Sequence, residues 1–129
     1  GNTFVAGFIG APSMNFMDGV ISENGAGMTA RVQDHEFRVP SVEGLGSGQK
    51  VILGIRPENT IMAERGVSGE ITVVEPTGSE THVVIRSGGR DFVSVVRERQ
   101  SLSPGQTVAM TAEPSNIHLF DSETGERLS

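Results

Sequence analysis

The chain has 129 residues, of which 36% are hydrophobic and 20% charged, and it contains 17 glycines, six prolines and no cysteine. This length fits one domain or two small ones, and the composition excludes a disordered polar chain in favour of a turn-rich globular fold. Without cysteine the chain has no disulfide framework, no thiolate nucleophile and no cysteine-type zinc site. Ten Lys and Arg side chains face 16 acidic ones, so the net charge is −6.

The distribution of charge argues against a nucleic-acid partner. The arginines are scattered from Arg31 to Arg127 among acidic residues, whereas a nucleic-acid binder concentrates its cations. Tyr and Trp are absent, so six phenylalanines would have to supply any base stacking. No apolar run approaches the roughly 20 residues that cross a bilayer, and no signal peptide opens the chain. We therefore expect a cytoplasmic location, no nucleic-acid partner and no direct membrane insertion.

The N-terminal segment differs from the rest of the chain. Apolar residues recur at helical spacing between Phe4 and Ile9, and Gly10-Ala11-Pro12 would end the run. About seven residues are too few for an isolated helix, so we expect this one to pack on a sheet or to continue from a longer chain. The sequence thus predicts a short linker helix within residues 1–12, followed by a β domain over residues 13–129.

The remaining apolar residues predict many short strands. They occur in runs of four to eight, rich in β-branched residues and bounded by Gly, Pro, Ser or Asn, which is the strand pattern. The predicted strands lie near 14–22, 27–33, 36–40, 50–57, 67–75, 80–87, 91–97, 106–113 and 116–120. We therefore predict an all-β, mainly antiparallel fold, either a sandwich or a small closed barrel.

Four predicted turns separate these strands. Asn24-Gly25 and Gly88-Gly89 suit type I′ turns, because both central residues can adopt a positive φ. In Glu75-Pro76-Thr77-Gly78 the proline presets φ near −65° and the glycine follows at the turn exit. Ser103-Pro104-Gly105 is a further turn. Turns at this density support the prediction of short antiparallel strands.

Motifs that could carry chemistry are weak. Gly44-Leu45-Gly46-Ser47-Gly48-Gln49-Lys50 is glycine-rich, but Gln49 separates Gly48 from Lys50 and an apolar strand follows, so it is not a phosphate loop. The histidines have no metal-ligand spacing. Ser79 and His82 are close in sequence, yet no serine lies in a nucleophile elbow. We predict no catalytic, cofactor-binding or metal-binding residue in this chain.

Two short segments are candidates for contact with a partner. In an extended Arg56-Pro57-Glu58 segment the two charged side chains would share one face, at a strand end or edge. They could equally form an ordinary exposed ion pair. The turn after Pro76 would project Ser79 and Glu80, as a contact point or as a solvated hairpin end.

Four segments, read in chain order, carry a resemblance to a known family. They are Asn2-Thr3-Phe4-Val5-Ala6-Gly7-Phe8-Ile9-Gly10-Ala11-Pro12 with Met14-Asn15-Phe16, Leu53-Gly54-Ile55-Arg56-Pro57-Glu58, Val74-Glu75-Pro76-Thr77-Gly78-Ser79-Glu80-Thr81-His82, and Ile117-His118-Leu119-Phe120-Asp121 with Thr124-Gly125-Glu126-Arg127-Leu128. Together they resemble the C-terminal, transport-associated (TOBE) region of the ATP-binding subunits of bacterial sugar ABC importers, of the maltose and glycerol-3-phosphate importer type. The resemblance covers essentially the whole chain.

The resemblance implies an oligonucleotide-fold-like (OB-like) regulatory and dimerisation domain. It implies a second copy as partner, permease subunits reached through an ATPase domain, a regulatory protein in some members, and a place on the cytoplasmic side of the inner membrane. ATP and Mg²⁺ would bind in that upstream ATPase domain, and no cofactor is expected here. The candidate partner or dimer contacts are Arg56, Glu58, Gly78, Ser79, Glu80 and His118.

Two alternatives remain open beside the importer domain. Related transport-associated domains bind small oxyanions such as molybdate between subunits, which would need backbone N–H groups and a cationic side chain. A barrel face could also bind single-stranded nucleic acid, although the charge and the low aromatic content oppose this. The apolar residues Met14, Phe16, Met17 and Phe120 could belong to the core or to a face that a partner covers.

Overall fold

The computed structural model describes residues 14–25, 27–97 and 101–129. In these residues the chain forms ten β-strands and two 3-10 helices, and no α-helix. The all-β prediction is therefore confirmed. The short helix predicted within residues 1–12 lies outside the described residues and stays a prediction.

The strands follow one another with short connections. They are β1 (Asn15–Asn24), β2 (Gly27–Val32), β3 (His35–Arg38), β4 (Lys50–Ile55), β5 (Ile61–Ala63), β6 (Val67–Thr77), β7 (Glu80–Ser87), β8 (Arg90–Val96), β9 (Thr107–Thr111) and β10 (His118–Asp121). The 3-10 helices are η1 (Pro57–Asn59) and η2 (Pro114–Asn116). Nine of these strands were predicted from apolar runs, and β5 was not.

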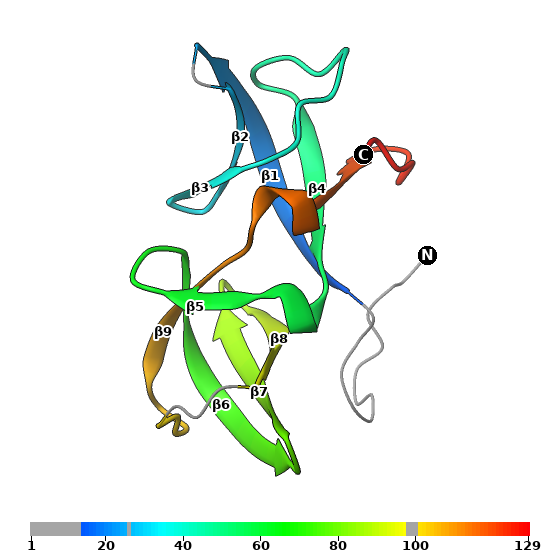
Figure 1. Cartoon of the computed structure of the whole chain (residues 1–129). Coiled ribbons are helices and arrows are strands. Elements are labelled where there is room, and N and C mark those ends of the chain that lie inside the picture. Colours follow the sequence, from blue (N-terminus) through cyan, green and yellow to red (C-terminus); the bar gives the residue numbers. More distant parts are fainter. Residues whose placement is uncertain (1–13, 26, 98–100) are drawn as a thin grey trace.

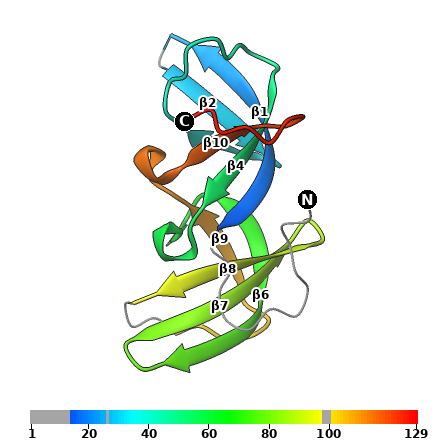
Figure 2. The ribbon, with the colours of Figure 1, turned by 90° about the vertical axis from the view of Figure 1, so that its right-hand side faces the viewer.

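These strands form two five-stranded sheets. The strand order is β10-β4-β1-β2-β3 in one, which we call the β1 sheet, and β5-β9-β6-β7-β8 in the other, the β6 sheet. Every pairing is antiparallel, as predicted. The β1 sheet lies above the β6 sheet in Figure 1, and Figure 2 shows the same arrangement after a quarter turn. The chain crosses between the sheets at η1 and returns at η2.

Alternation along the strands directs one face of each sheet into a shared core. In β2, Met28, Ala30 and Val32 are buried, while Thr29 and Arg31 between them are not, as expected for a strand with one solvated face. The buried apolar side chains of both sheets form one cluster. Its largest fully buried members are Phe37, Met17, Ile21, Leu53, Ile55, Ile71, Ile85, Met110, Ile117 and Leu119.

The side chain of Asn15 joins the two sheets. It is 2% exposed, and its Nδ2 donates to the backbone oxygens of Val93 (2.9 Å) and Ile55 (3.2 Å). Its Oδ1 accepts the backbone N–H of Val93 at 2.9 Å. Nearby, Arg90 of β8 forms an exposed ion pair with Asp18 of β1 at 3.2 Å. The beginning of β1 is therefore fastened to β8.

Two further side-chain contacts join the sheets at β2–β3. Gln33, in the turn before β3, donates from Nε2 to Ser87 Oγ of β7 at 3.1 Å. His35 Nε2 lies 3.3 Å from Thr111 Oγ1 of β9. These polar contacts accompany the shared apolar core, so the sheets form one packed unit.

Two of the predicted turns have the predicted residues. Ser87 pairs with Arg90, which leaves Gly88 and Gly89 as the loop between β7 and β8. Their φ angles are +57° and +80°, as a type I′ turn requires. The turn at Ser103-Pro104-Gly105 is also present, closed by the Gln106 N–H to Ser103 O hydrogen bond at 3.2 Å.

The other two turns are displaced along the chain. Asn24 still pairs with Gly27, so the β1–β2 turn begins one residue later than predicted. Pro76 pairs with Thr81 inside the β6–β7 ladder, and the prediction that it opens the turn is wrong. In antiparallel strands joined by two residues, the second pair from the turn is not hydrogen-bonded. Pro76 therefore needs no N–H toward β7, which is why β6 accommodates a proline there.

Candidate contact surfaces at the β4–β10 corner and the β6–β7 turn

The six residues predicted as contacts separate into two groups. Arg56 and Glu58 follow β4, and His118 begins β10, the strand beside β4. Gly78, Ser79 and Glu80 lie at the β6–β7 turn, in the other sheet. The structure thus provides two separate candidate surfaces rather than one site.

The Arg56-Pro57-Glu58 segment forms a 3-10 turn rather than the extended segment predicted. β4 ends at Ile55, and the Asn59 N–H donates to the oxygen of Arg56 at 2.9 Å. Arg56 and Glu58 are exposed and belong to none of the ion pairs among the described residues. The predicted ion pair between them is therefore absent from that part of the chain.

η1 is held in place from below by buried groups. Pro57 is buried, and its oxygen accepts the hydroxyl of Thr60 at 2.8 Å. The Thr60 hydroxyl also makes a short hydrogen bond with the hydroxyl of Ser94 in β8. Both hydroxyl residues are buried. Arg56 and Glu58 are consequently exposed on a turn whose backbone is held by buried hydrogen bonds.

His118 lies against the guanidinium group of Arg127, which is nine positions further along the chain. Arg127 Nη2 is 2.7 Å from His118 Nδ1, so the arginine donates and the imidazole accepts through this nitrogen. Burial, followed by the positive charges of Arg127 and Arg56, lowers the pKa of His118 below its ordinary value, and a backbone hydrogen bond with Ser129 only partly opposes this. Neutral imidazole is the form that can accept the Arg127 hydrogen bond.

The C-terminal residues fold back on β10 and bring Arg127 to this position. Phe120 and Arg127 form an isolated antiparallel bridge, and the Leu128 N–H donates to Leu119 O at 2.7 Å. Asp121 Oδ1 accepts the N–H groups of Thr124 (2.9 Å) and Glu123 (2.8 Å) within the turn. These hydrogen bonds lower the pKa of Asp121.

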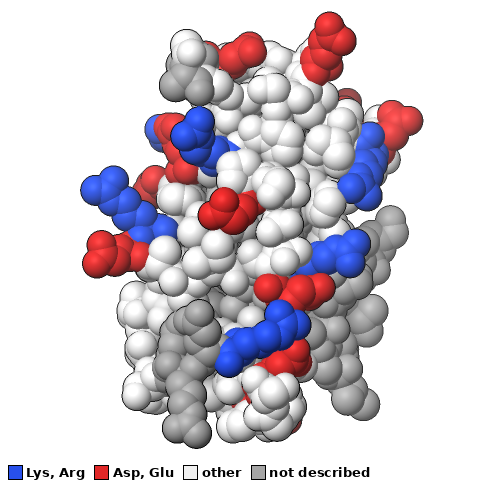
Figure 3. Space-filling view, viewed as in Figure 1, with Lys and Arg blue, Asp and Glu red and all other residues white. Residues whose placement is uncertain are grey.

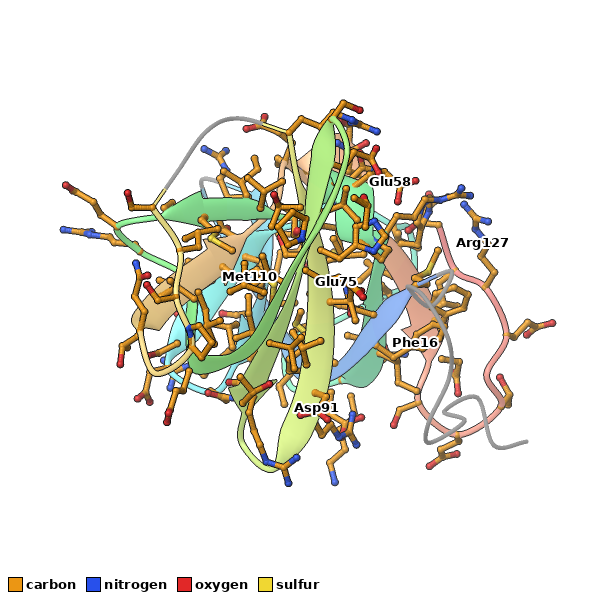
Figure 4. The ribbon with its side chains drawn as sticks, turned by 90° about the horizontal axis from the view of Figure 1, so that it is seen from below. Phe16, Glu58, Glu75, Asp91, Met110 and Arg127 are labelled. Atoms are coloured by element: carbon orange, nitrogen blue, oxygen red, sulfur yellow. The ribbon has the colours of Figure 1, made fainter. Side chains whose placement is uncertain are left out.

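Aromatic residues adjoin this corner on the outer face of the β1 sheet. Phe16 and Phe120 pack edge to face, with ring centroids 5.8 Å apart. They flank Gly54, where an added Cβ would lie 2.9 Å from Phe120 Cε2 and also collide with Met14 Sδ. Met14, Phe16 and Phe120 are half-buried, whereas Met17 is in the core. In Figure 4, Phe16, Glu58 and Arg127 lie on the same side of the molecule.

The β6–β7 turn forms the second candidate surface. Gly78 has a φ of +84°, a conformation that glycine adopts without strain, and Ser79 is exposed beside it. Glu80 is paired on its own sheet, with Arg97 Nη2 at 3.1 Å and with His82 Nε2 at 3.5 Å. Ser79 is thus presented at the tip, while Glu80 is already engaged.

An open hollow in the β6 sheet contains none of the predicted contact residues. Met62 of β5, Val108 of β9 and Leu102 contribute apolar lining, and His35 of β3 also lines it. Burial lowers the pKa of His35, against the opposing effect of Glu36. We assign no ligand to this hollow.

Among the described residues, no His, Asp and Glu side chains gather in a group that could hold a metal ion. The glycine-rich loop at 44–48 leads into β4 and not into a helix. On the face shown in Figure 3, acidic and basic side chains are interspersed rather than gathered into one charged surface. The described helices are all too short to cross a membrane.

Comparison with known proteins agrees with this β-rich arrangement. Residues 53–120 match the family model of the TOBE domain, and residues 10–60 match that of the MalK OB fold domain. The protein is therefore of the transport-associated, OB-like class. The chain belongs to the TOBE domain family, as the resemblance in its sequence implied.

Its relatives include ATP-binding proteins of transporters. An ABC transporter ATP-binding protein of Sinorhizobium fredii is 38% identical over 99% of this chain and 34% of its own length. The trehalose/maltose import ATP-binding protein MalK of Thermococcus litoralis is 38% identical over 98% of this chain and 37% of that protein. The Vibrio cholerae maltose/maltodextrin import ATP-binding protein MalK is 36% identical over 95% and 35%. The chain thus spans about a third of the length of these curated relatives.

One solved structure shares the fold at low identity. The cytoplasmic molybdate-binding protein ModG matches with a TM-score of 0.66 and 17% identity, over 86% of this chain and 96% of the ModG chain. At this identity the likeness shows the fold alone. It confirms the prediction of an OB-like arrangement of short strands.

Proposed function

We propose that this chain is the C-terminal regulatory and dimerisation domain of the ATP-binding subunit of a bacterial sugar ABC importer. The observation that carries the proposal is the similarity, over 98% and 95% of this chain, to the import ATP-binding proteins for trehalose/maltose and for maltose/maltodextrin. The transported substrate is a carbohydrate or glycerol-3-phosphate.

In this proposal the domain holds two subunits together and regulates the ATPase domain, which lies elsewhere on the subunit. ATP and Mg²⁺ bind in the ATPase domain, which couples hydrolysis to uptake, and this chain performs no hydrolysis itself. The subunit pairs with a second copy, contacts permease subunits through the ATPase domain, and lies at the cytoplasmic face of the inner membrane. Exposed, rigidly held side chains and two packed sheets with one core support such an assembly role.

The residues proposed to make partner contacts remain those predicted from the sequence. Arg56, Glu58 and His118 would contribute the surface at the β4–β10 corner, and Gly78 with Ser79 the surface at the β6–β7 turn. Glu80 would act there through its ion pair with Arg97 and its contact with His82, at the end of β7 next to the turn. A regulatory protein or the second copy are the partners that we propose for them.

A chimera tests this function. This chain replaces the matching third of the Vibrio cholerae relative in a strain that lacks the natural subunit. We expect maltose-dependent growth to return. A matched chimera carrying ModG, which shares the fold but has 17% identity to this chain, should not restore growth if the family-specific surfaces matter. If the chimera that contains this chain accumulates normally in the strain and the strain still imports no maltose, the proposal is contradicted.

A second candidate function is a small-oxyanion-binding domain of a related transporter, because molybdate binding is the function printed for ModG, which shares the fold. Oxyanion sites use backbone N–H groups with a cationic side chain. Calorimetric titration of the chain with molybdate and sulfate separates the two functions. Heat of binding from molybdate supports the oxyanion function, and its absence supports the importer domain.

A further inference from the structure

The outer face of the β6 sheet carries apolar side chains at its centre. Val83 and Ile85 of β7 belong to the shared core, so the alternate residues of that strand face outward. Cross-strand pairing places Val73, Val84 and Val93 in one outward row, which we call the valine row. Val73 is 48% exposed, the highest value among the large hydrophobic side chains of the described residues, whereas Val93 is 3% exposed. The free apolar surface is therefore centred on β6 and β7.

Two exposed ion pairs border this apolar centre, six residues apart along β7. At one end Arg86 of β7 pairs with Asp91 of β8 at 3.1 Å. At the other end Glu80 of β7 pairs with Arg97, which follows β8, also at 3.1 Å. The cation thus lies on β7 at one end and beside β8 at the other, so the order of the signs is reversed between the two ends.

This reversal makes the face complementary to itself. A two-fold axis that runs across the strands, midway between the two ion pairs, lays β7 antiparallel on β7 of a second copy. Arg86 then faces Glu80 of the second copy, and Asp91 faces its Arg97. An axis parallel to the strands would instead set Arg86 against Arg86 and Glu80 against Glu80. The charge pattern therefore favours a second copy in one orientation.

The other acidic side chains of the face meet no like charge in this orientation. The ladder places Glu70 against Thr77 of the second copy and Glu75 against its Val73. β9 pairs with β6 only from Val67 to Glu70. The side of β6 at Glu75 is therefore open, and the carboxylate there stays in water.

The contact is small. From Arg86 to Glu80 the face is four outward residues long and three strands wide, which is roughly 300 Å² per copy at ordinary strand spacings. A stable interface buries about 800 Å² per partner. We therefore expect a weak dimer of the isolated chain, with a dissociation constant of about 1 mM. Two copies joined through the rest of an ATP-binding subunit would meet at an effective concentration of that order.

We propose that the outer face of the β6 sheet binds the same face of a second copy, with β7 antiparallel to β7. The valine row supplies the apolar contact, and the ion pairs at its two ends fix the orientation. This contact deepens the proposed function, on which it rests, by giving the second copy a surface apart from the turn tip at Gly78 and Ser79.

The test is a dilution series of the ¹⁵N-labelled chain from about 2 mM to about 0.05 mM, which brackets this dissociation constant. Backbone amide shifts and translational diffusion measure the self-association. We expect concentration-dependent shifts centred on Val73, Val84 and Arg86, with slower diffusion at the higher concentrations. R86E and E80R should each weaken the association at least fivefold, because a two-fold contact contains each residue twice.

The double variant R86E/E80R is the sharper test. It restores opposite charges across the two-fold axis while both ion pairs within each copy stay broken, so the dissociation constant should return to within about twofold of the wild-type value. R31E is the matched control, because Arg31 is 63% exposed and paired with Glu36 on the other sheet, and it should leave the association unchanged. All variants should keep the amide shifts of the core, because exposed ion pairs contribute little to stability.

Four outcomes would overturn the proposal. They are shifts that do not depend on concentration, shifts centred on the β1 sheet, a double variant as weak as either single variant, and an equal loss in R31E. The proposed function still stands after any of these if the chimera restores maltose-dependent growth. Self-association through this face in a chimera that restores no growth contradicts the function alone.

Discussion

Asn15 of β1 and Val93 of β8 exchange two hydrogen bonds, so a side-chain amide stands in for a strand at the edge of the β6 sheet. Val93 lies at a position of β8 that is not hydrogen-bonded to β7, since Ser87 and Arg90 flank the turn and the pairs alternate from there. Its N–H and C=O therefore point away from β7. Asn15 satisfies both groups and blocks this part of an otherwise open edge.

Replacing Asn15 by leucine should destabilise the protein strongly. The substitution leaves the buried N–H and C=O of Val93 without partners and removes the hydrogen bond to Ile55. We expect the free energy of unfolding to fall by about 2–4 kcal/mol, because each of the two buried polar groups left unsatisfied costs about 1–3 kcal/mol. Urea unfolding measures this. Asn59→Ala, which loses no side-chain hydrogen bond to a described residue, should cost no more than about 0.5 kcal/mol.

The neighbouring ion pair should matter much less. Asp18 and Arg90 also join the two sheets, at 3.2 Å, but their side chains are 72% and 48% exposed. Solvent screens such a pair, so Asp18→Asn should lower the free energy of unfolding by less than about 1 kcal/mol. Unfolding curves at low and high salt provide the check. A loss as large as that of Asn15→Leu would show that charge, and not the amide, fastens the sheets.

Gly66 should not tolerate a side chain. A Cβ there would collide with the backbone of Met110, including its carbonyl carbon at 2.6 Å and its nitrogen at 2.7 Å. Backbone cannot rotate out of the way as a side-chain tip can, so Gly66→Ala should cost about 3 kcal/mol or more. Gly46 is the matched control, because an added Cβ meets no atom within 4 Å and its φ is not positive. Equal midpoints of thermal unfolding for the two variants would refute this expectation.

Acidification should destabilise the protein through His118 and His35. Both have a pKa lowered below 6.5 in the folded chain, by burial first, with Arg127 and Arg56 adding to the effect at His118. Glu36 opposes it at His35. Near and below pH 6.5 the unfolded chain binds more protons than the folded chain. The contribution of these histidines to the free energy of unfolding is therefore fully present above about pH 6.5 and declines below it.

Urea unfolding at about pH 7.5 and pH 5.5 measures this decline, since the two values bracket the ordinary imidazole pKa. His118→Asn should reduce the decline, because an amide oxygen can still accept from Arg127 and does not titrate in this range. His35→Asn should reduce it independently. A wild-type protein equally stable at both pH values would contradict the assignment of neutral imidazoles.

Strand identity could be read from the sequence because runs such as Val51-Ile52-Leu53 are apolar, rich in β-branched residues and bounded by turn residues. β5 was missed because its three residues form no such run and their pairing with β9 depends on distant contacts. Pro76 was misplaced because turn chemistry and edge-strand chemistry both favour proline. Local pattern alone could not decide between them.

The candidate surfaces were predictable in part. Arg56 and Glu58 were identified from their position at a strand end, but the approach of Arg127 to His118 depends on the backbone of Leu119 and Leu128 closing the tail on β10. Likewise, nothing local marks Asn15 as a link between sheets, because its partner Val93 is 78 residues away. Contacts of this kind arise from tertiary pairing.

Sedimentation velocity of the Vibrio cholerae chimera with bound ATP tests the proposed role of this chain in holding two copies of an ATP-binding subunit together. The comparison is the same subunit lacking the replaced third. We predict a dimer for the chimera and a larger monomer fraction for the shortened subunit at equal concentration. A chimera that sediments as a monomer where the natural subunit is dimeric would rule out this dimerisation role.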